Sequence, residues 1–195
     1  PGKKWHHYLR GSLHDRFNRG GPCFRAEGCR ISSSVESLNP ETCSRSCYLM
    51  TPTVLFLHAL TTVFMTGLIW FVQVVHYPLK AMVDTGSFTA YQRAHQTRTA
   101  WIVGPPMLVE ISCSLWLVIA LPEPLPPPLL IISFAFLVLI WLSTAVFSAP
   151  CHRKLSTGFN PGVHRKLVST NWIRTTLWSA RGALSIYFLL SFGGT

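Results

Sequence analysis

Apolar residues are gathered into long runs separated by shorter polar stretches. Residues 53–75 form a run of 23 residues without a formal charge, residues 101–121 carry a single acid, and residues 129–149 are again uncharged. A helix needs about 20 apolar residues to cross a bilayer. The runs lack the apolar/polar alternation of barrel strands and are about twice as long as such strands. The pattern therefore predicts three membrane-spanning α-helices.

A fourth span is predicted over residues 169–192, although this segment contains basic side chains. Its uncharged end, residues 182–192, has only 11 residues and is too short to cross alone. If the segment spans, Arg181 enters the membrane with it, and a re-entrant or surface helix is the alternative. With the fourth span, residues 50–195 are expected to form an all-α, polytopic membrane four-helix bundle whose two termini share one side.

A faint internal repeat relates the two halves of this domain at an offset of 76 residues. The aligned pairs are His76 with His152, Leu79 with Leu155, Gly86 with Gly162, Arg98 with Arg174 and Thr99 with Thr175, and His95 falls opposite Asn171. Parallel repeats about an axis along the membrane normal are known in membrane proteins. The repeat therefore favours two tandem helical hairpins.

Residues 1–49 differ in kind from the rest of the chain. They contain four of the six cysteines, eight of the seventeen lysines and arginines, and no helical or strand periodicity. Their cysteine spacing does not match a zinc site, and the composition is typical of a disordered tail. Because Met50 directly precedes the first span, a start-site artefact upstream of Met50 is the alternative interpretation.

Composition and charge support the membrane interpretation and bear on the orientation of the chain in the membrane. With 49% hydrophobic and 12% charged residues, the chain has about half the charge of a soluble domain, which favours the lipid bilayer as its partner. Lysines and arginines gather in the first and third connections and are absent from the second, whose prolines suit a turn or a helix start. The positive-inside rule makes the first and third connections cytoplasmic, whereas a basic tail kept in the cytosol argues the opposite. Basic residues at membrane edges do not form a face for nucleic acid.

Polar side chains collect at the four helix ends that meet the first and third connections. In a four-span protein both connections lie on one side of the membrane, so we expect a polar pocket at that rim. The candidates are His76, Tyr77, His95, Arg98, Glu110, His152, Asn171 and Arg174. The last helix also carries one stripe at helical spacing, made of Asn171, Arg174, Trp178 and Arg181. Such a stripe normally faces the bundle interior, and snorkelling of Arg174 to the headgroups is the alternative.

Glu110 and Arg181 are expected to pair in the middle of the membrane. Each lies nine residues beyond a tryptophan, a residue that often marks the interface. Both helices enter from the same rim, so at 1.5 Å per residue both groups reach a depth of roughly 14 Å. A lone charge there costs about 2.5–3.5 kcal/mol on insertion scales. Pairing offsets much of that cost, which makes the pair a structural feature.

Three classes of function are compatible with the polar rim. A pocket for a small aromatic or amphipathic molecule could hold an oxygen with His95, Asn171 and Arg174, and use a histidine or Glu110 as base. Its aromatic side would consist of Tyr77, Tyr91, Trp101, Trp172 and Trp178. Haem or a metal could be held by His76, His95, His152 and His164, but the chain has no H-x3-H, CxxCH or HExxH motif. The third class is a non-enzymatic accessory or assembly subunit of a membrane complex. The residues alone do not decide whether the protein is an enzyme.

Several stretches resemble a group of small uncharacterised bacterial integral membrane proteins. These are MTGLIWFVQVVHYPL, PPMLVE, IWLSTA, PCHRKLSTGF and LVSTNWIRTTLW, which together lie within residues 50–190. The resemblance implies a multi-pass protein of the bacterial inner membrane. More distantly, P-x-H-x-x-L followed by L-x3-N-x2-R is similar to the end of the four-helix membrane family that contains fungal anthrone oxygenases. The matching positions are Pro150, His152, Leu155, Leu167, Asn171 and Arg174. That resemblance implies cofactor-free oxygenation of an activated aromatic.

Overall fold

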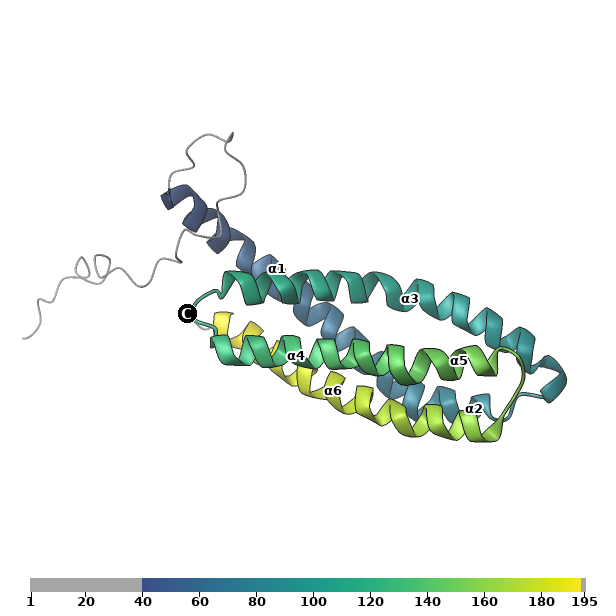
Figure 1. The fold of residues 1–195 in the computed structure, drawn as a ribbon. Coiled ribbons are helices and arrows are strands. Elements are labelled where there is room, and N and C mark those ends of the chain that lie inside the picture. The colour runs from purple at the N-terminus through teal and green to yellow at the C-terminus, as the bar shows by residue number, and fades with distance from the viewer. Residues whose placement is uncertain (1–39, 194–195) are drawn as a thin grey trace, which may run out of the picture. The chain divides into compact units, whose positions relative to one another are not determined.

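The computed structural model of this chain describes residues 40–193, which form four long helical segments joined by short connections (Figure 1). The elements follow in the order α1 (Pro40–Phe71), η1 (Val72–His76), α2 (Tyr77–Lys80), α3 (Thr85–Ala120), α4 (Pro127–Ser143), η2 (Thr144–Ser148), α5 (Ala149–Leu155) and α6 (Pro161–Gly193). The labels η1 and η2 denote π-helical turns. No strand occurs among residues 40–193, and the predicted all-α class is confirmed.

The two π-helical turns interrupt the first and third segments shortly before a proline. Pro78 is the second residue of α2, and Pro150 is the second residue of α5. A proline inside a helix lacks an N–H group, and its ring clashes with the carbonyl four residues earlier. A π turn inserts one extra residue and relaxes the hydrogen-bond ladder at that place. Each segment therefore continues past its proline instead of ending there.

The first and third connections lie at one end of the bundle, and the second lies at the other end (Figure 1). Asp84 begins α3, since its carboxylate accepts a hydrogen bond from the Gly86 backbone N–H at 2.9 Å. At the opposite end, Leu121 takes a left-handed conformation, with φ 43°, and ends α3. Pro127 and Pro128 then occupy the first turn of α4, as the proline run predicts. The first and third connections thus share one end of the bundle.

The helices extend beyond the predicted spans, which corrects several boundaries. The spans expected at about 53–75, 129–149 and 169–192 lie inside helical segments 40–80, 127–155 and 161–193, and the span 101–121 lies in segment 85–120 except for its last residue. The first and third connections shrink to residues 81–84 and 156–160. The apolar runs mark only the part of each helix that suits lipid. Polar residues next to them continue the helices, so the rim residues lie on helices and not in loops.

Residues 40–49 are also helical, whereas the sequence predicted no regular structure there. Pro40 is the first residue of α1, a position where proline needs no partner for an N–H group. No glycine or proline follows before Pro52, so the helix of the first span extends back through these polar residues. The rest of the predicted tail, residues 1–39, lies outside the described residues.

Polar side chains are buried inside the bundle, and large apolar side chains cover its outside. Glu110, Asn171 and Arg181 are 0% exposed, while Phe56 and Val146 are 57% and 60% exposed. The interior also contains apolar clusters, but a water-soluble protein rarely exposes so many large apolar side chains. Three segments of the described chain are long and apolar enough to cross a membrane, namely Met50–Lys80, Thr85–Ala120 and Pro127–Leu155.

Candidate functional site

Glu110 and Arg181 meet inside the bundle. Arg181 Nη2 lies 2.5 Å from Glu110 Oε1, and Arg181 Nε donates to the same oxygen at 3.0 Å. Both side chains are 0% exposed. The pairing expected from the equal distance of the two residues from a tryptophan is therefore present in the structure.

The remaining donors of Arg181 are also used. Its Nη1 group donates to the backbone carbonyl of Ser133 and lies 3.2 Å from Ser133 Oγ. Its Nη2 group donates to Ser114 Oγ at 3.0 Å and lies 3.4 Å from His58 Nε2. Thr62 donates to Glu110 Oε1 at 3.0 Å. We call His58, Thr62, Glu110, Ser114, Ser133 and Arg181 the mid-bundle cluster. His58 Nδ1 and Glu110 Oε2 are the atoms of this cluster without a hydrogen-bond partner among the described residues. The Arg181 charge is tolerated in the interior because its own donors all have partners.

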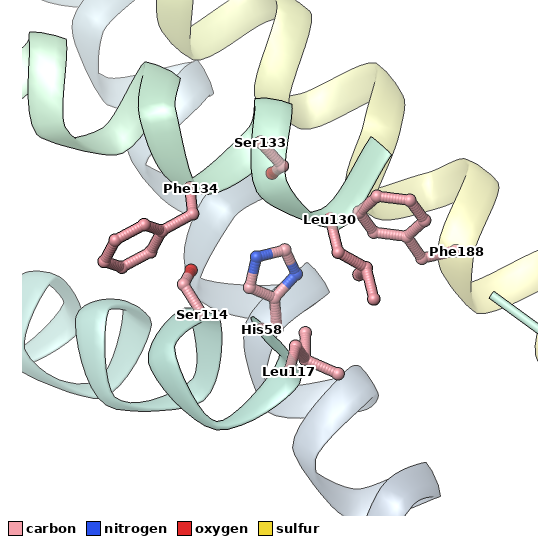
Figure 2. A pocket seen from close by; sticks show the side chains of 7 residues that line it. All are labelled: His58, Ser114, Leu117, Leu130, Ser133, Phe134 and Phe188. Carbon is pink, nitrogen blue, oxygen red and sulfur yellow. The ribbon is translucent and has the colours of Figure 1, made fainter. Parts of the chain in front are cut away.

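His58 belongs to this cluster but was missed by the sequence analysis. Figure 2 shows its ring in a pocket lined also by Ser114, Leu117, Leu130, Ser133, Phe134 and Phe188. The pocket is too narrow to hold a water molecule. The lone histidine of the first span lies four residues before Thr62, on the same helical face, and this spacing could have identified it. The mid-bundle cluster therefore joins the helices and leaves no room for a ligand.

A second polar network lies toward the end of the bundle that carries the first and third connections. Asn171, which is 0% exposed, donates through Nδ2 to Gln73 Oε1 at 2.6 Å. Its Oδ1 atom accepts from Arg174 Nε at 3.0 Å and from Arg174 Nη2. Arg174 also reaches Tyr77 Oη and Thr144 Oγ1, each at 3.4 Å. Gln73 and Thr144 belong to η1 and η2, and π turns often occur at functional sites.

Histidines from three segments lie next to this network. The rings of His76 and His95 are stacked with centroids 4.2 Å apart, and the His152 ring lies 6.4 Å from that of His95. Gln92 Nε2 lies 3.1 Å from His152 Nδ1. Tyr91 stacks on His95 at 6.2 Å. These rings form an aromatic wall beside the hydrogen-bonded network.

We call the combined group the end cluster. Its members are Gln73, His76, Tyr77, Lys80, Tyr91, Gln92, His95, Thr144, His152, Asn171 and Arg174. Three of its buried polar atoms have no hydrogen-bond partner within the described part of the chain: His76 Nε2, Lys80 Nζ and Gln92 Oε1. The end cluster therefore has unused donors and an unused acceptor, which a bound molecule could engage.

The structure brings six of the eight predicted pocket residues together in the end cluster: His76, Tyr77, His95, His152, Asn171 and Arg174. Arg98 was assigned wrongly, because it is exposed on α3. The inward face of that helix includes Phe88, Gln92 and Thr99, and Arg98 lies beside this face. Glu110 does not belong to the pocket either, because Arg181 holds it in the mid-bundle cluster.

The predicted aromatic lining is correct only in part. Tyr77 and Tyr91 lie in the end cluster, whereas Trp101 and Trp172 are 78% and 45% exposed. Trp178 is buried in an apolar cluster with Leu137 and Ile140 instead. Large amphipathic rings on the outside of a membrane helix suit the interface region, so their outward position has a physical reason.

Lys80 and Gln92 are the end-cluster residues that sequence reasoning missed. Lys80 was counted only among the basic residues of the first connection, although it lies four residues after His76 on the same face of the helix. Gln92 similarly precedes His95 by three residues. His164 instead has a structural role, because its Nε2–H group donates to the Tyr77 carbonyl at 3.0 Å. Burial lowers the pKa of His164, as does the Lys80 charge, while the bond to Tyr77 acts in the opposite direction.

Within residues 40–193, no group of three or more histidine, cysteine, aspartate or glutamate side chains is arranged to hold a metal ion. The chain matches no family model, no curated protein and no solved structure. Functional inference therefore depends on the geometry of the end cluster and on the chemistry of its side chains.

Proposed function

We propose that this protein is a four-span integral membrane protein whose end cluster binds a small aromatic or amphipathic molecule. Helix α6 supplies the fourth span in this proposal. Its polar residues Asn171, Arg174 and Arg181 face inward and are hydrogen-bonded. Its outward residues include Ile173, Ile186 and Leu190, which are 43%, 48% and 69% exposed. An apolar outer face supports insertion even where the overall composition of a helix is more polar.

The observation that carries the binding proposal is the unfinished hydrogen bonding of the end cluster. Its side chains come from all four helical segments. Burying polar side chains whose hydrogen bonds are incomplete costs free energy, so such a group is expected where it has a function. Arg174 contacts Tyr77 and Thr144 only at 3.4 Å, beyond the usual range of a strong hydrogen bond. These weak contacts can be exchanged for contacts with a ligand oxygen, while the stacked rings of His76, His95 and Tyr91 offer an aromatic surface.

Oxygenation of an activated aromatic by dioxygen is the chemistry that we propose for the bound molecule. A ring CH2 group would become a carbonyl with one oxygen atom, and the second oxygen atom would leave as water with the two hydrogens. Arg174 and the Tyr77 hydroxyl would hold a phenolic or enolic oxygen, and a neutral histidine would accept a proton from it. The resemblance to the family of anthrone oxygenases supports this choice. Of its matching positions, His152, Asn171 and Arg174 are members of the end cluster, and Leu155 and Leu167 pack in the apolar cluster around Tyr77.

Native mass spectrometry of the purified protein tests the binding proposal. The wild type should retain a small molecule, and Arg174→Gln should lose it with little change in thermal stability, because Arg174 is only half-buried. Arg165→Gln is the matched control, since Arg165 is exposed near the same end of the bundle. Retention of the same mass in Arg174→Gln would contradict the proposal. A wild type that carries only a protein partner would favour an accessory subunit.

A further inference from the structure

We propose that the end cluster binds an anionic oxygen, such as a carboxylate or phenolate, and that Lys80 is its main charged ligand. This inference rests on the proposed function and specifies the chemistry of the molecule that is bound. Lys80 lies at the end of α2, where the first segment reaches the connection to α3. Its side chain is 0% exposed.

Lys80 has no partner that explains its burial. Among residues 50–193, its Nζ group donates no hydrogen bond, and the ion pair between side chains of this range joins Arg181 and Glu110 instead. An ammonium group removed from water without a counterion is strongly unfavourable. Buried lysines are accordingly rare unless they are paired. A ligand of opposite charge would supply the missing partner.

No acid among residues 50–193 is placed to take this role. Glu110 accepts two hydrogen bonds from Arg181 and one from Thr62 in the mid-bundle cluster. Asp84 is exposed and caps α3 through the Gly86 N–H. Glu123 lies in the connection at the opposite end of the bundle. The positive charges of Lys80 and Arg174 therefore share one region without a carboxylate from residues 50–193.

The surroundings of Lys80 suit a bound anion rather than a metal. Lys80 lies four residues after His76 on the same face of the first segment, at the end of the bundle where His95 and His152 also lie. A cation at the same place would be repelled by Lys80 and Arg174. An anion would be attracted by both, and the unpartnered His76 Nε2 can donate a further hydrogen bond to it. The stacked histidines would then cover the apolar part of the molecule.

The test compares naphthoate with its neutral isostere naphthamide by equilibrium dialysis against the protein in nanodiscs of phosphatidylcholine. Wild type should bind naphthoate more tightly than naphthamide. Lys80→Met should weaken the binding of naphthoate by about 30-fold or more, as expected when one partner of a buried charged contact is removed. Lys80→Arg should retain much of the affinity. Lys154→Met, which removes an exposed lysine near the same end of the bundle, should bind like the wild type.

Thermal unfolding without any probe gives a second measurement. Lys80→Met should raise the Tm, because it removes an unpaired buried charge and keeps the length of the side chain. A clear fall in the Tm would show that Lys80 is paired in the free protein and would overturn the inference. Addition of phosphatidylglycerol to the nanodiscs identifies the source of the anion: competition with naphthoate indicates a lipid headgroup, and its absence indicates a free molecule. Both results support an anion site.

The outcomes also separate this inference from the proposed function. In one outcome the wild type binds naphthoate and naphthamide equally, and this binding is lost in Arg174→Gln and unchanged in Lys80→Met. That result would overturn the anion site and leave aromatic binding in place. Failure of naphthoate to bind the wild type would overturn the anion site. The proposed function would then be judged by the co-purified molecule alone. Absence of any such molecule, together with no binding of either probe, would remove both proposals.

Discussion

The buried polar residues of this protein differ in how far their hydrogen bonds are completed. Arg181 uses its donors on Glu110, Ser114 and Ser133, and Asn171 is held by Gln73 and Arg174. Lys80 has no partner within the described residues. Arg181 has no donor left to exchange with a ligand, which indicates a structural role. His58 Nδ1 and Glu110 Oε2 in the mid-bundle cluster also lack a partner among the described residues, but the pocket beside His58 is too narrow for a water molecule. An incomplete set indicates a place where a ligand can gain contacts.

Single substitutions in the buried ion pair should be more damaging than the double substitution. Glu110→Leu or Arg181→Leu alone should lower the stability by about 3–5 kcal/mol, because each leaves an unpaired buried charge. The double change to leucine should recover much of that loss, although Ser114, Ser133 and His58 would lose their contacts with Arg181. Thermal unfolding of the four proteins in detergent measures the coupling. Additive losses without recovery would show that the two charges do not depend on each other.

At the scale of helices, the ends and interruptions position the end cluster. The π turns η1 and η2 let the first and third segments continue past Pro78 and Pro150, and they contribute Gln73 and Thr144 to the network. The cap at Asp84 begins α3 four residues after Lys80, so that Gln92 and His95 reach the same end of the bundle. The helix ends and π turns thus bring these residues to the same level along the bundle.

Substitutions of Asp84 test this cap. Asp84→Ala should lower the stability by about 1 kcal/mol, because the oxygen that accepts the Gly86 N–H is removed. Asp84→Asn keeps a side-chain oxygen that can accept this bond, so it should lower the stability only slightly. The measurement is thermal unfolding in detergent, with Thr85→Ala as the neighbouring control. If Asn is as damaging as Ala, the negative charge of Asp84 at the N-terminus of α3 matters more than the oxygen of its cap.

At the scale of the whole molecule, the four segments place the first and third connections at one end of the bundle (Figure 1). Three segments are apolar and long enough to cross a membrane, and α6 packs against α4 and α5 with its polar stripe inward. A four-span topology follows if α6 crosses with its neighbours. The end cluster would then lie near one membrane surface, and the mid-bundle cluster would lie deeper.

Cysteine-accessibility labelling tests this topology. Single cysteines at Thr85 and Thr157 should be labelled from one side of the membrane and a cysteine at Glu123 from the other, in a background without the native cysteines. All three residues are exposed in the connections or next to them. Absolute orientation does not affect the comparison. Labelling of Thr85 and Thr157 from opposite sides would rule out four spans, as would labelling of Glu123 from the same side as both.

The sequence alone determined the helical class and the approximate place of each long helix. Long apolar runs without apolar/polar alternation have few stable conformations other than an α-helix. It also identified Glu110 with Arg181, since equal spacing from a tryptophan gives equal depth. The stripe of Asn171, Arg174 and Trp178 followed from helical periodicity and lies on the buried face of α6. The helices and the stripe on α6 are each set by a single stretch of sequence. The pairing of Glu110 with Arg181 depends only on how deep each residue lies along its helix axis.

Only the tertiary structure decided which side chains of different helices meet. Depth along an axis does not fix rotation about it, so Arg98 was expected inside and lies outside, while Gln92 was overlooked and is buried. Helix rotation likewise turns His58 toward Arg181 and buries Lys80. Helix rotation is set by packing among all four segments and by the π turns. That information is distributed over residues far apart in the chain, and no single run of sequence contains it.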